Sequence, residues 1–412
     1  MMKQITAIVI GAGLRGNIYA SYAHRYPEEL KIIGVAEPDE TRRKTFQESY
    51  GIPDSLCFST WEDILEQGKI ADAAIICTMD RMHYGPAMKA LSLDYDLLLE
   101  KPISPSPEEC EEIAALAAAR NRKVLICHVL RYTPFFKLVK QLVSEGKIGD
   151  LVSIQHNENV GHIHQSHSFV RGNWRSSMES SPMILQKCCH DMDILQWLAG
   201  EEVIALSSFG GLRYFNSENA PEGAPDYCME GCVHSEACPY YAPKVYLSEG
   251  EYRWMRSAVA VDTSAENISR LLPSSPYGRC VFHCDNDVVD HQVVNMKFAN
   301  GVTVAFTMCG FTQKTDRTLK LMGTKGELRA KMSDEDVVEV FDFETGVTAQ
   351  YHPAQAGSGH GGGDDGIMRD LIRYLNGYPG STSLTEIQDS LRSHRMAFDA
   401  ERARVEGILI QH

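Results

Sequence analysis

The chain begins with an apolar run that breaks into a glycine-rich loop, and this combination restricts the fold more than any other feature. Residues 5–16 read Ile-Thr-Ala-Ile-Val-Ile-Gly-Ala-Gly-Leu-Arg-Gly. Such a continuous apolar run is typical of a buried parallel strand. Gly11 permits a tight turn, Gly13 lets backbone N–H groups approach a diphosphate, and Gly16 lets the next helix pack closely on the strand. The pattern predicts a dinucleotide-binding loop at the positive end of a helix. The alternative is a chance glycine turn in another α/β protein.

An acidic residue follows at the distance expected for a dinucleotide site. Glu37 ends the next apolar run, residues 30–36, and lies 21 residues after Gly16. At that distance a carboxylate can accept hydrogen bonds from both ribose hydroxyls of NAD, and it would repel the 2′-phosphate of NADP. We therefore expect NAD as the cofactor. Arg42 and Arg43 could instead approach such a phosphate, although a solvated helix face is the simpler interpretation of both.

Composition describes an ordinary globular protein and narrows the partners. The 412 residues are enough for two domains, and 43% of them are hydrophobic and 23% charged. A net charge of −15 argues against nucleic acid and an anionic membrane as partners, because both attract basic faces. No signal-peptide stretch opens the chain and no apolar run reaches membrane-spanning length. We expect a cytoplasmic protein in which the 12 cysteines stay reduced.

The first third alternates strands and helices, which predicts a doubly wound parallel sheet, that is, an α/β Rossmann domain over residues 1–130. Apolar runs predict the strands, and Ser106 is a candidate N-cap for one of the helices. Beyond the two strands above, we expect strands at 71–78, 96–100 and 123–130 and helices at 84–93 and 107–121.

The pattern changes after about residue 131, which predicts a second, α+β domain over 131–412 with an open, mainly antiparallel sheet. Asn300-Gly301 and the stretch 323–326 are typical of hairpin turns between its strands. A polar, Pro- and Gly-rich stretch opens an irregular, cysteine-rich insertion at about 216–284. The expected strands are 151–158, 288–298, 302–309, 317–322, 327–331 and 337–343, and the expected helices are 134–145, 366–375 and 383–406.

Glu100-Lys101-Pro102 forms the second informative site, at the end of an expected strand. Ligands of doubly wound sheets bind beyond the carboxyl ends of the strands. Hydride transfer from a secondary alcohol to NAD leaves a hydroxyl proton that a base must accept. A partly desolvated lysine beside a cationic nicotinamide loses its proton more readily and can act as that base. Pro102 would fix the backbone there, with a cis bond as one option. A surface lysine at a strand end is the alternative interpretation.

At these motifs the sequence resembles the glucose–fructose oxidoreductase and inositol dehydrogenase family, called Gfo/Idh/MocA. The glycine loop, Glu37, the Glu100-Lys101-Pro102 triplet and the turn 323–326 carry the resemblance, which covers nearly the whole chain. It implies NAD(P)-dependent oxidation of a sugar, polyol or related hydroxyl, with Lys101 in the catalytic centre. The loop 78–83 is similar to the family loop along the cofactor. The expected cofactor contacts are Gly11, Gly13, Leu14, Arg15, Gly16, Glu37, Thr78, His83, Glu100 and Lys101.

The second domain departs from the family at its catalytic signature. The signature is usually an Asp followed four residues later by a His, and here Gln186 and His190 occupy the two positions. An amide can orient a hydroxyl but cannot take its proton. The resemblance therefore implies a catalytic or substrate-contacting His190, with Lys187 supplying the missing polar group. A capping role of His190 at the helix that follows is the alternative.

A third site is the loop 359–364, Gly-His-Gly-Gly-Gly-Asp. Three glycines after His360 let the backbone approach a ligand closely, and a flexible linker is the alternative. The motif resembles the His-Gly-Gly segment of the family's NAD-dependent glycosidases, such as the α-N-acetylgalactosaminidases, which makes His360 a candidate acid or base. The expected catalytic residues are Lys101, His190, Lys187 and His360. The expected substrate contacts are His162, His164, Arg171, Trp174, Lys187, His190 and His360.

The cysteines of the insertion predict a structural zinc site, because their spacing matches that of zinc ligands. The segment 226–240 has too few apolar residues to hold itself against chain entropy, which a tetrahedral thiolate site would offset. Cys238-Pro239 is also similar to the ending of bacterial iron–sulfur motifs, although the spacing differs. Free cysteines in a loop are the remaining interpretation. The expected ligands are Cys228, Cys232, Cys238 and either Cys280 or Cys284.

These inferences predict an NAD-dependent oxidoreductase that oxidises a ring hydroxyl of a sugar or glycoside. One alternative is a redox-assisted glycoside hydrolase, in which His360 drives elimination between oxidation and the return of the hydride. A second alternative is a non-catalytic sensor of NAD and sugar. The partner is a small carbohydrate or glycoside. Because look-alikes associate through the exposed sheet of the second domain, we expect a homodimer or homotetramer.

Overall fold

The structure of the protein, a computed structural model, describes residues 2–354 and 360–412. Its first sheet has six strands in the order β3-β2-β1-β4-β5-β6, and all neighbouring pairs run parallel. The sheet reverses its strand order between β1 and β4, which is where ligands of doubly wound sheets bind. The strands are β1 (Ile5–Ile10), β2 (Leu30–Ala36), β3 (Cys57–Phe58), β4 (Ala73–Ile76), β5 (Asp96–Leu99) and β6 (Val124–Ile126).

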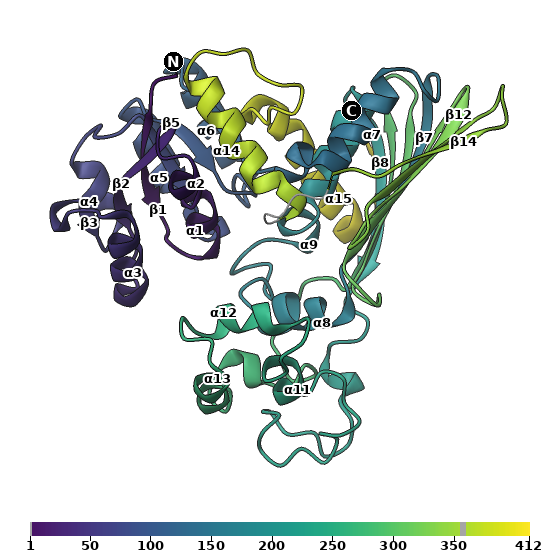
Figure 1. Cartoon of the computed structure of the whole chain (residues 1–412). Helices are drawn as coiled ribbons and strands as arrows, with labels where there is room; N and C mark the ends of the chain where they lie inside the picture. The colour runs from purple at the N-terminus through teal and green to yellow at the C-terminus, as the bar shows by residue number, and fades with distance from the viewer. Residues whose placement is uncertain (1, 355–359) are drawn as a thin grey trace.

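Helices cover both faces of this sheet, and each face has its own hydrophobic cluster (Figure 1). The side chain of Ser106 accepts a hydrogen bond from the N–H of Glu109, which confirms the predicted N-cap of α6. The helices are α1 (Leu14–Ala20), α2 (Tyr22–Arg25), α3 (Glu40–Tyr50), α4 (Trp61–Glu66), α5 (Tyr84–Ser92) and α6 (Pro107–Ala119), with short helices η1 (Asp54–Leu56), η2 (Asp80–Met82) and η3 (Val129–Tyr132).

The second sheet has nine strands in the order β14-β13-β12-β11-β7-β10-β9-β8-β15. It is mixed but mainly antiparallel, since β7 and β10 pair in parallel and the other described pairs are antiparallel. The two sheets together confirm the predicted fold class. The strands are β7 (Leu151–Asn159), β8 (Val203–Gly211), β9 (His291–Phe298), β10 (Thr303–Cys309), β11 (Asp316–Gly323), β12 (Gly326–Met332), β13 (Val337–Asp342), β14 (Thr348–Tyr351) and β15 (Ile410–Gln411).

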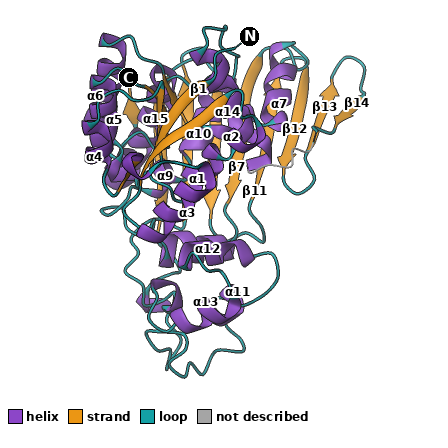
Figure 2. Cartoon of the chain, turned by 60° about the vertical axis from the view of Figure 1, so that its left-hand side comes forward, coloured by secondary structure: helices purple, strands orange, loops and turns teal. Residues whose placement is uncertain are grey.

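Helices line one face of the second sheet, while its other face is turned away from the core (Figure 2). Buried and exposed residues alternate along β9 and β10, as expected of an antiparallel sheet packed on one side. The helices on the packed side are α7 (Pro134–Ser144), α9 (Met183–Gln186), α10 (Cys189–Ala199) and α15 (Ile387–Glu406).

The C-terminal helices return the chain to the first domain. Helix α14 (Gly363–Leu375), which follows η8 (His360–Gly362), places Ile367 and Leu371 in the hydrophobic cluster on one face of the parallel sheet. The start of α15 contributes Ile387 and Leu391 to the cluster on the other face. This packing brings the segment that contains His360 next to α1. The proposed division at residues 130 and 131 stays a prediction.

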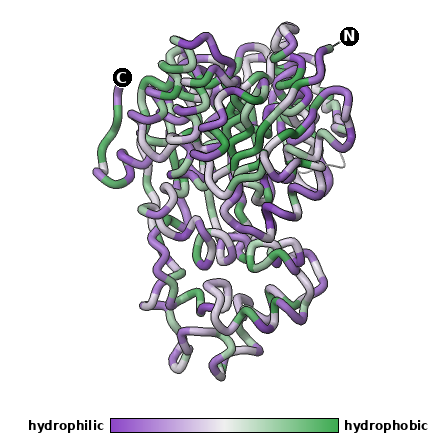
Figure 3. Tube along the Cα trace, turned by 90° about the vertical axis from the view of Figure 1, so that its left-hand side faces the viewer, coloured by the Kyte–Doolittle hydropathy of each residue, from purple (hydrophilic) through white to green (hydrophobic). Residues whose placement is uncertain are grey.

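The insertion between β8 and β9 forms a lobe beneath the two sheets (Figure 1). It has a hydrophobic cluster of its own, centred on buried aromatic side chains such as Tyr246 and Tyr277. Figure 3 shows the hydrophobic segments concentrated in the upper part of the molecule and a more mixed pattern in this lobe. The lobe contains η5 (Ser217–Asn219), α11 (Ala242–Tyr246), η6 (Arg253–Met255), α12 (Arg256–Val259), α13 (Ala265–Leu271) and η7 (Pro276–Gly278), and it packs on α8 (His162–His164) and the π-helical turn η4 (Gln165–Arg171).

Among the described helices, none is both long and apolar enough to cross a bilayer.

Candidate active site

The glycine-rich loop joins β1 to α1, and two of its glycines have no room for a side chain. Gly11 has φ +92°, and a Cβ there would lie 2.6 Å from the carbonyl oxygen of Cys77. A Cβ at Gly16 would lie 2.1 Å from the carbonyl oxygen of Gly11. At Gly13, in contrast, no described atom lies within 4 Å of the Cβ position, and the Leu14 side chain is exposed. A tight turn with an uncovered backbone at the start of a helix is what a diphosphate requires.

Glu37 follows β2 at the same edge of the sheet, and the loop holds its carboxylate. The residue is 5% exposed and accepts hydrogen bonds from the N–H groups of Ala12 at 2.8 Å and Asp39 at 3.0 Å. A carboxylate is therefore fixed where NAD-binding sheets hold a ribose. Arg43 donates to the carbonyl oxygen of Glu37 at 2.5 Å, so its guanidinium is tied to the main chain behind this carboxylate.

Glu100 and Lys101 follow β5, beside the point where the strand order reverses. Glu100 accepts hydrogen bonds from Nε of Arg15 at 2.7 Å, from the hydroxyl of Tyr19 at 2.8 Å and from the N–H of Lys101 at 2.8 Å. Burial alone would raise the pKa of Glu100, but the positive charges of Arg15 and Lys101 outweigh burial and lower it. Glu100 is thus an anion that ties α1 to the strand end. The peptide bond between Lys101 and Pro102 is cis.

The side chain of Lys101 reaches the second domain. Its Nζ donates to the carbonyl oxygen of Gln186 at 2.7 Å, at the end of α9. The amide of Gln186 donates instead to the carbonyl oxygens of Trp174 at 2.9 Å and Ser181 at 3.0 Å. Gln186, which replaces the Asp of the resembled signature, therefore gives Lys101 a main-chain acceptor and uses its side chain to hold the preceding loop.

His190 lies in the first turn of α10, four residues after Gln186. It is 8% exposed, and its Nδ1 is buried with no hydrogen-bond partner in the described part of the chain. Burial lowers the pKa of His190 well below its ordinary value of about 6.5, and the charge of Lys101 lowers it further. The imidazole is consequently neutral near pH 7 and can accept a proton.

A second buried histidine, His128, packs edge-on against His190 with 5.8 Å between ring centroids. It follows β6, and neither of its ring nitrogens has a hydrogen-bond partner among the residues described. Burial, together with the charges of Arg131 and Lys101, lowers the pKa of His128, so this ring is neutral as well. Sequence reasoning missed His128, although its place after the last parallel strand was a usable signal.

Lys187 belongs to a buried ionic cluster. Its Nζ lies 3.2 Å from Glu158, and Arg317 lies 2.5 Å from Glu158 and 2.8 Å from Asp191. His156 contacts the same Asp191 carboxylate at 2.7 Å. Burial raises the pKa of Glu158 in spite of the charges of Arg317 and Lys187. Sequence reasoning missed the partners of Lys187 because Glu158 and Arg317 meet only through the register of β7 on β11.

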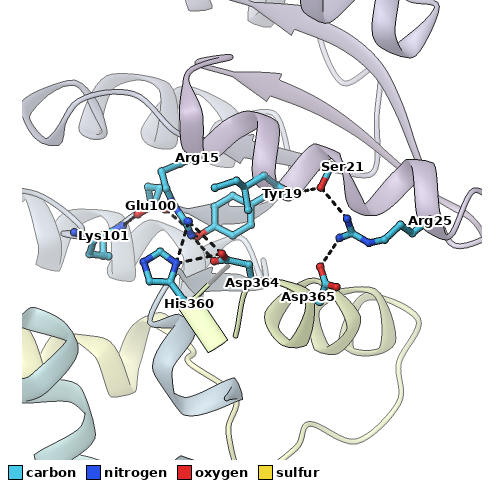
Figure 4. Close-up of polar contacts among 10 residues, drawn as sticks. Arg15, Tyr19, Ser21, Arg25, Glu100, Lys101, His360, Asp364 and Asp365 are labelled. Atoms are coloured by element: carbon cyan, nitrogen blue, oxygen red, sulfur yellow. Dashed lines mark hydrogen bonds and ion pairs between the residues drawn. The ribbon is translucent and has the colours of Figure 1, made fainter. Parts of the chain in front are cut away.

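His360 and Asp364 join the site from the start of α14 (Figure 4). His360 has φ +49°, and the two glycines after it also have positive φ, which folds the backbone into a tight left-handed turn. Nδ1 of His360 lies 3.1 Å from Asp364, whose other oxygen accepts from Arg15 at 2.6 Å. The rings of His360 and His190 are 6.3 Å apart. The first residue of this motif, Gly359, lies outside the described residues.

Thr78 and His83 close the loop after β4. The hydroxyl of Thr78 donates to the carbonyl oxygen of Met82 at 3.0 Å. His83 is 1% exposed, and its ring nitrogens lie 2.7 Å from the carbonyl oxygen of Pro102 and 3.0 Å from that of Thr78. A neutral imidazole can donate to one of these oxygens at a time. His83 therefore joins two loops at the edge of the sheet and is covered by them.

The remaining predicted substrate contacts lie toward the insertion. Arg171 is 1% exposed and donates to the carbonyl oxygens of Arg279 and Tyr240, both at 2.7 Å. It is thus part of the core of the insertion, and the prediction of a substrate contact is wrong for this residue. The His162 ring also lies against Tyr240. Trp174 lies beside Gln186, and the His164 ring contacts Phe169, which contacts Trp174.

The cysteines of the insertion do not form the predicted zinc site. Among residues 2–354 and 360–412, no group of three or more His, Cys, Asp or Glu side chains is placed to hold a metal ion. Sγ of Cys228 lies 3.7 Å from the carbonyl oxygen of Arg279, and Sγ of Cys284 lies 3.2 Å from that of Cys280. Burial raises the pKa of Cys238 and Cys280, and that of Cys284 to about 11. Cys228 and Cys280 instead belong to the hydrophobic cluster of the lobe, Cys238 and Cys284 pack against it, and Cys232 is half-buried.

Known proteins with a similar sequence or fold include oxidoreductases whose substrate is named and others whose substrate is not. The chain is 24% identical to the putative oxidoreductase YteT of Bacillus subtilis over 387 residues, covering 88% of each chain. It is 25% identical to an inositol 2-dehydrogenase of Corynebacterium glutamicum over 207 residues, which is 50% of this chain and 57% of that protein. The WlbA dehydrogenase from Bordetella pertussis, solved in complex with NADH and UDP-GlcNAcA, is similar in structure with a TM-score of 0.66, 14% identity and 99% of each chain covered.

Two family models match most of the chain. The model of the oxidoreductase family's NAD-binding Rossmann fold matches residues 5–128, and that of the same family's C-terminal alpha/beta domain matches residues 140–356. The first match contains the glycine loop, Glu37 and Lys101, and the second contains His190. The chain therefore belongs to the Gfo/Idh/MocA family of NAD-binding oxidoreductases.

Proposed function

We propose that this protein oxidises a ring hydroxyl of a sugar or glycoside, with NAD as the hydride acceptor. The observation that carries the proposal is the position of Lys101. Its Nζ extends from the end of β5 to within 2.7 Å of the carbonyl oxygen of Gln186, which lies four residues before His190. Two groups that can handle a hydroxyl proton thus meet where the two domains join. An inositol dehydrogenase relative and a similar fold bound to a nucleotide sugar support the carbohydrate class.

The residues present fit the cofactor. The uncovered backbone at Gly13 and the start of α1 would hold the diphosphate, and the Glu37 carboxylate would hold the adenosine ribose. When bound, NAD supplies the nicotinamide carbon that accepts the hydride. Arg15 and Tyr19 hold the Glu100 carboxylate, which accepts a hydrogen bond from the main-chain N–H of Lys101. The main chain from which the Lys101 side chain extends is therefore held in place.

Lys101 and His190 have separate tasks in this proposal. The Nζ of Lys101 donates a hydrogen bond to the substrate oxygen, while neutral His190 accepts the hydroxyl proton at a ring nitrogen as the C–H bond breaks. Burial and the charge of Lys101 lower the pKa of His190, so one of its ring nitrogens carries no proton near pH 7. Lys187, which forms an ion pair with Glu158, would bind a second hydroxyl of the substrate.

The test is a substrate screen with a matched pair of lysine variants. Monosaccharides, disaccharides and aryl glycosides are incubated with NAD, and NADH absorbance and product masses are recorded. Lys101→Ala should lower kcat by about 10²–10³-fold, the usual cost of removing one donor to an oxygen on which charge develops. Lys89→Ala, an exposed lysine of α5, is the control and should leave kcat unchanged. Unchanged turnover of Lys101→Ala would refute the assignment, and sugar binding without any turnover would favour the sensor alternative.

His360 supports a second candidate function, redox-assisted hydrolysis of a glycoside. Asp364 holds this histidine at 3.1 Å and its ring lies 6.3 Å from that of His190. After oxidation of a ring hydroxyl, the neighbouring C–H is acidic, and a base there could drive loss of the aglycone before water adds and the hydride returns. Aglycone release without accumulation of NADH would favour this candidate. Stoichiometric NADH with an intact glycosidic bond would favour simple oxidation.

A further inference from the structure

A cavity of about 240 Å³ lies between the insertion and the second sheet. Its walls come from α8, from the segment 251–255 around η6 and from the turn 313–315 before β11. Figure 1 shows α12, which directly follows η6, beside α8. Complete small-molecule sites are usually about 300–1,000 Å³. The cavity therefore has the size for one ring of a ligand whose other part is bound elsewhere.

One wall of the cavity is an aromatic surface. Trp254 is 50% exposed, although it is fixed by edge-to-face contacts with His164 at 5.5 Å and His167 at 5.6 Å. The adjacent Met255 is buried and anchors the turn. One face of a pyranose ring consists of C–H groups, which pack well on a rigid aromatic ring with a polar rim. A fixed and half-exposed indole in a concave site is suited to that contact.

Polar groups surround this aromatic surface. Nδ1 of His164 lies 3.2 Å from the hydroxyl of Thr315, and Lys314 and Asp334 form an ion pair at 3.0 Å. Glu251 adds an exposed carboxylate to the lining. Hydroxyls at the edge of a sugar ring need donors and acceptors of these kinds. The lining thus combines the two chemistries that a sugar ring presents.

A row of ring contacts leads from the cavity wall toward the candidate active site. His164 lies 5.9 Å from Phe169, and Phe169 lies 6.3 Å from Trp174, whose carbonyl oxygen accepts from Gln186. Burial lowers the pKa of His164, and the charge of Lys187 adds to this, which places Lys187 within electrostatic reach. Gln186 and Lys187 belong to the site proposed for oxidation. A ligand could therefore occupy both places at once.

We propose that this cavity is a second sugar subsite, in which Trp254 stacks on the ring attached to the one that is oxidised. The inference rests on the proposed function, from which it takes the sugar class. It makes the preferred substrate a disaccharide or larger glycoside and makes the insertion the element that selects it. A free monosaccharide would fill the oxidation site and leave the subsite empty.

The test measures sugar binding rather than turnover, on the full chain loaded with NADH so that no oxidation occurs. Calorimetric titrations use cellobiose, lactose and maltose together with their components glucose and galactose. At least one disaccharide should bind more tightly than its components. Trp254→Ala should weaken that disaccharide about 5–10-fold, as expected for loss of an aromatic contact, and should leave monosaccharide binding unchanged. Trp254→Phe should restore part of the loss.

Phe209→Ala is the matched control, because Phe209 is a 63% exposed aromatic residue on β8 outside the cavity lining. It should change neither affinity, and thermal unfolding of each variant checks that the fold is kept. Equal affinity for disaccharides and monosaccharides, unaffected by Trp254→Ala, would overturn the subsite and leave the proposed function standing. No binding of any sugar in the set would overturn the subsite together with the sugar class of the proposed function.

Discussion

Adjacent carboxylates at the start of α14 offer a sharp test of the network that joins the C-terminal segment to the nucleotide-binding domain (Figure 4). The side chain of Asp364 is 2% exposed and lies 2.6 Å from Arg15, which is 24% exposed. Asp365 pairs with Arg25, and their side chains are 25% and 43% exposed. The two aspartates lie in the same helix turn, and each has its own arginine partner on the first domain. They differ in burial.

Asp364→Asn keeps the volume of the side chain and removes its charge. Breaking a fully buried ion pair costs about 3–5 kcal/mol, but Arg15 is partly exposed and keeps Glu100 as a partner. We therefore expect the free energy of unfolding to fall by about 2–3 kcal/mol. Asp365→Asn removes a surface pair and should cost about 0–1 kcal/mol.

The acid dependence gives this prediction a second, independent measure. Burial would raise the pKa of Asp364, but His360 and Arg15 outweigh it and lower the pKa. A group with a lowered folded pKa stabilises the fold above its unfolded pKa of about 3.9 and loses that contribution as pH falls through the folded value. The gap in stability between wild type and Asp364→Asn should thus be full near pH 7 and shrink below about pH 3.9.

Urea unfolding of wild type and both variants, followed by circular dichroism at several pH values, measures these differences. Equal losses for Asp364→Asn and Asp365→Asn near pH 7 would show that burial of Asp364 does not strengthen the pair. A gap that grows on acidification would contradict the sign of the pKa argument.

Three further predictions concern the cofactor, the proton acceptor and the insertion. Glu37→Gln should weaken NAD binding about tenfold, because a charge-assisted hydrogen bond to the ribose is lost. NADP binding should stay the same or improve, because the charge that repels its 2′-phosphate is removed. Fluorescence titration with both nucleotides measures the two affinities. Because the pKa of His190 is lowered, the acid limb of kcat/KM should fall below pH 6.5, and a limb above that value would argue against His190 as the base. Arg171→Met leaves two carbonyl oxygens without their donor, so proteolysis should become faster within residues 212–290, whereas equal proteolysis of wild type and variant would contradict the structural role of Arg171.

The parts of the fold that could be predicted from the sequence are those set by local pattern. A continuous apolar run followed by Gly-x-Gly-x-x-Gly defines β1, the loop and α1 within a short segment, and Glu37 and Lys101 follow from strand ends in the same domain. The strand β8 was not predicted, because its Ser-Ser and Gly-Gly pairs read as a loop. It is a strand because β9 pairs with it, in continuous register from Ala205 to Gly211 after an irregularity near Val203. The predicted cytoplasmic location and homo-oligomer remain predictions.

The candidate site was predicted only in part, for a physical reason that its residues make plain. Lys187 was predicted without Glu158 and Arg317, because their meeting depends on the register of β11 against β7, strands far apart in sequence. His360 was predicted without Arg15 as its neighbour, because α14 must first return to the parallel sheet. Such contacts depend on packing between distant segments, which spacing along the chain does not encode.

The cysteines of the insertion show the opposite error. Their spacing matches that of zinc ligands, but in the described structure they do not form the predicted zinc site. A zinc site needs several ligands directed at one point, and among the described residues no group of three or more His, Cys, Asp or Glu side chains is placed in that way. The chain entropy of the insertion is instead offset by an apolar cluster around Tyr246 and by Arg171, whose guanidinium binds two carbonyl oxygens of the lobe. Because that arrangement fixes the segment carrying Trp254 against α8, the same contacts that stabilise the lobe also shape the cavity beside Trp254.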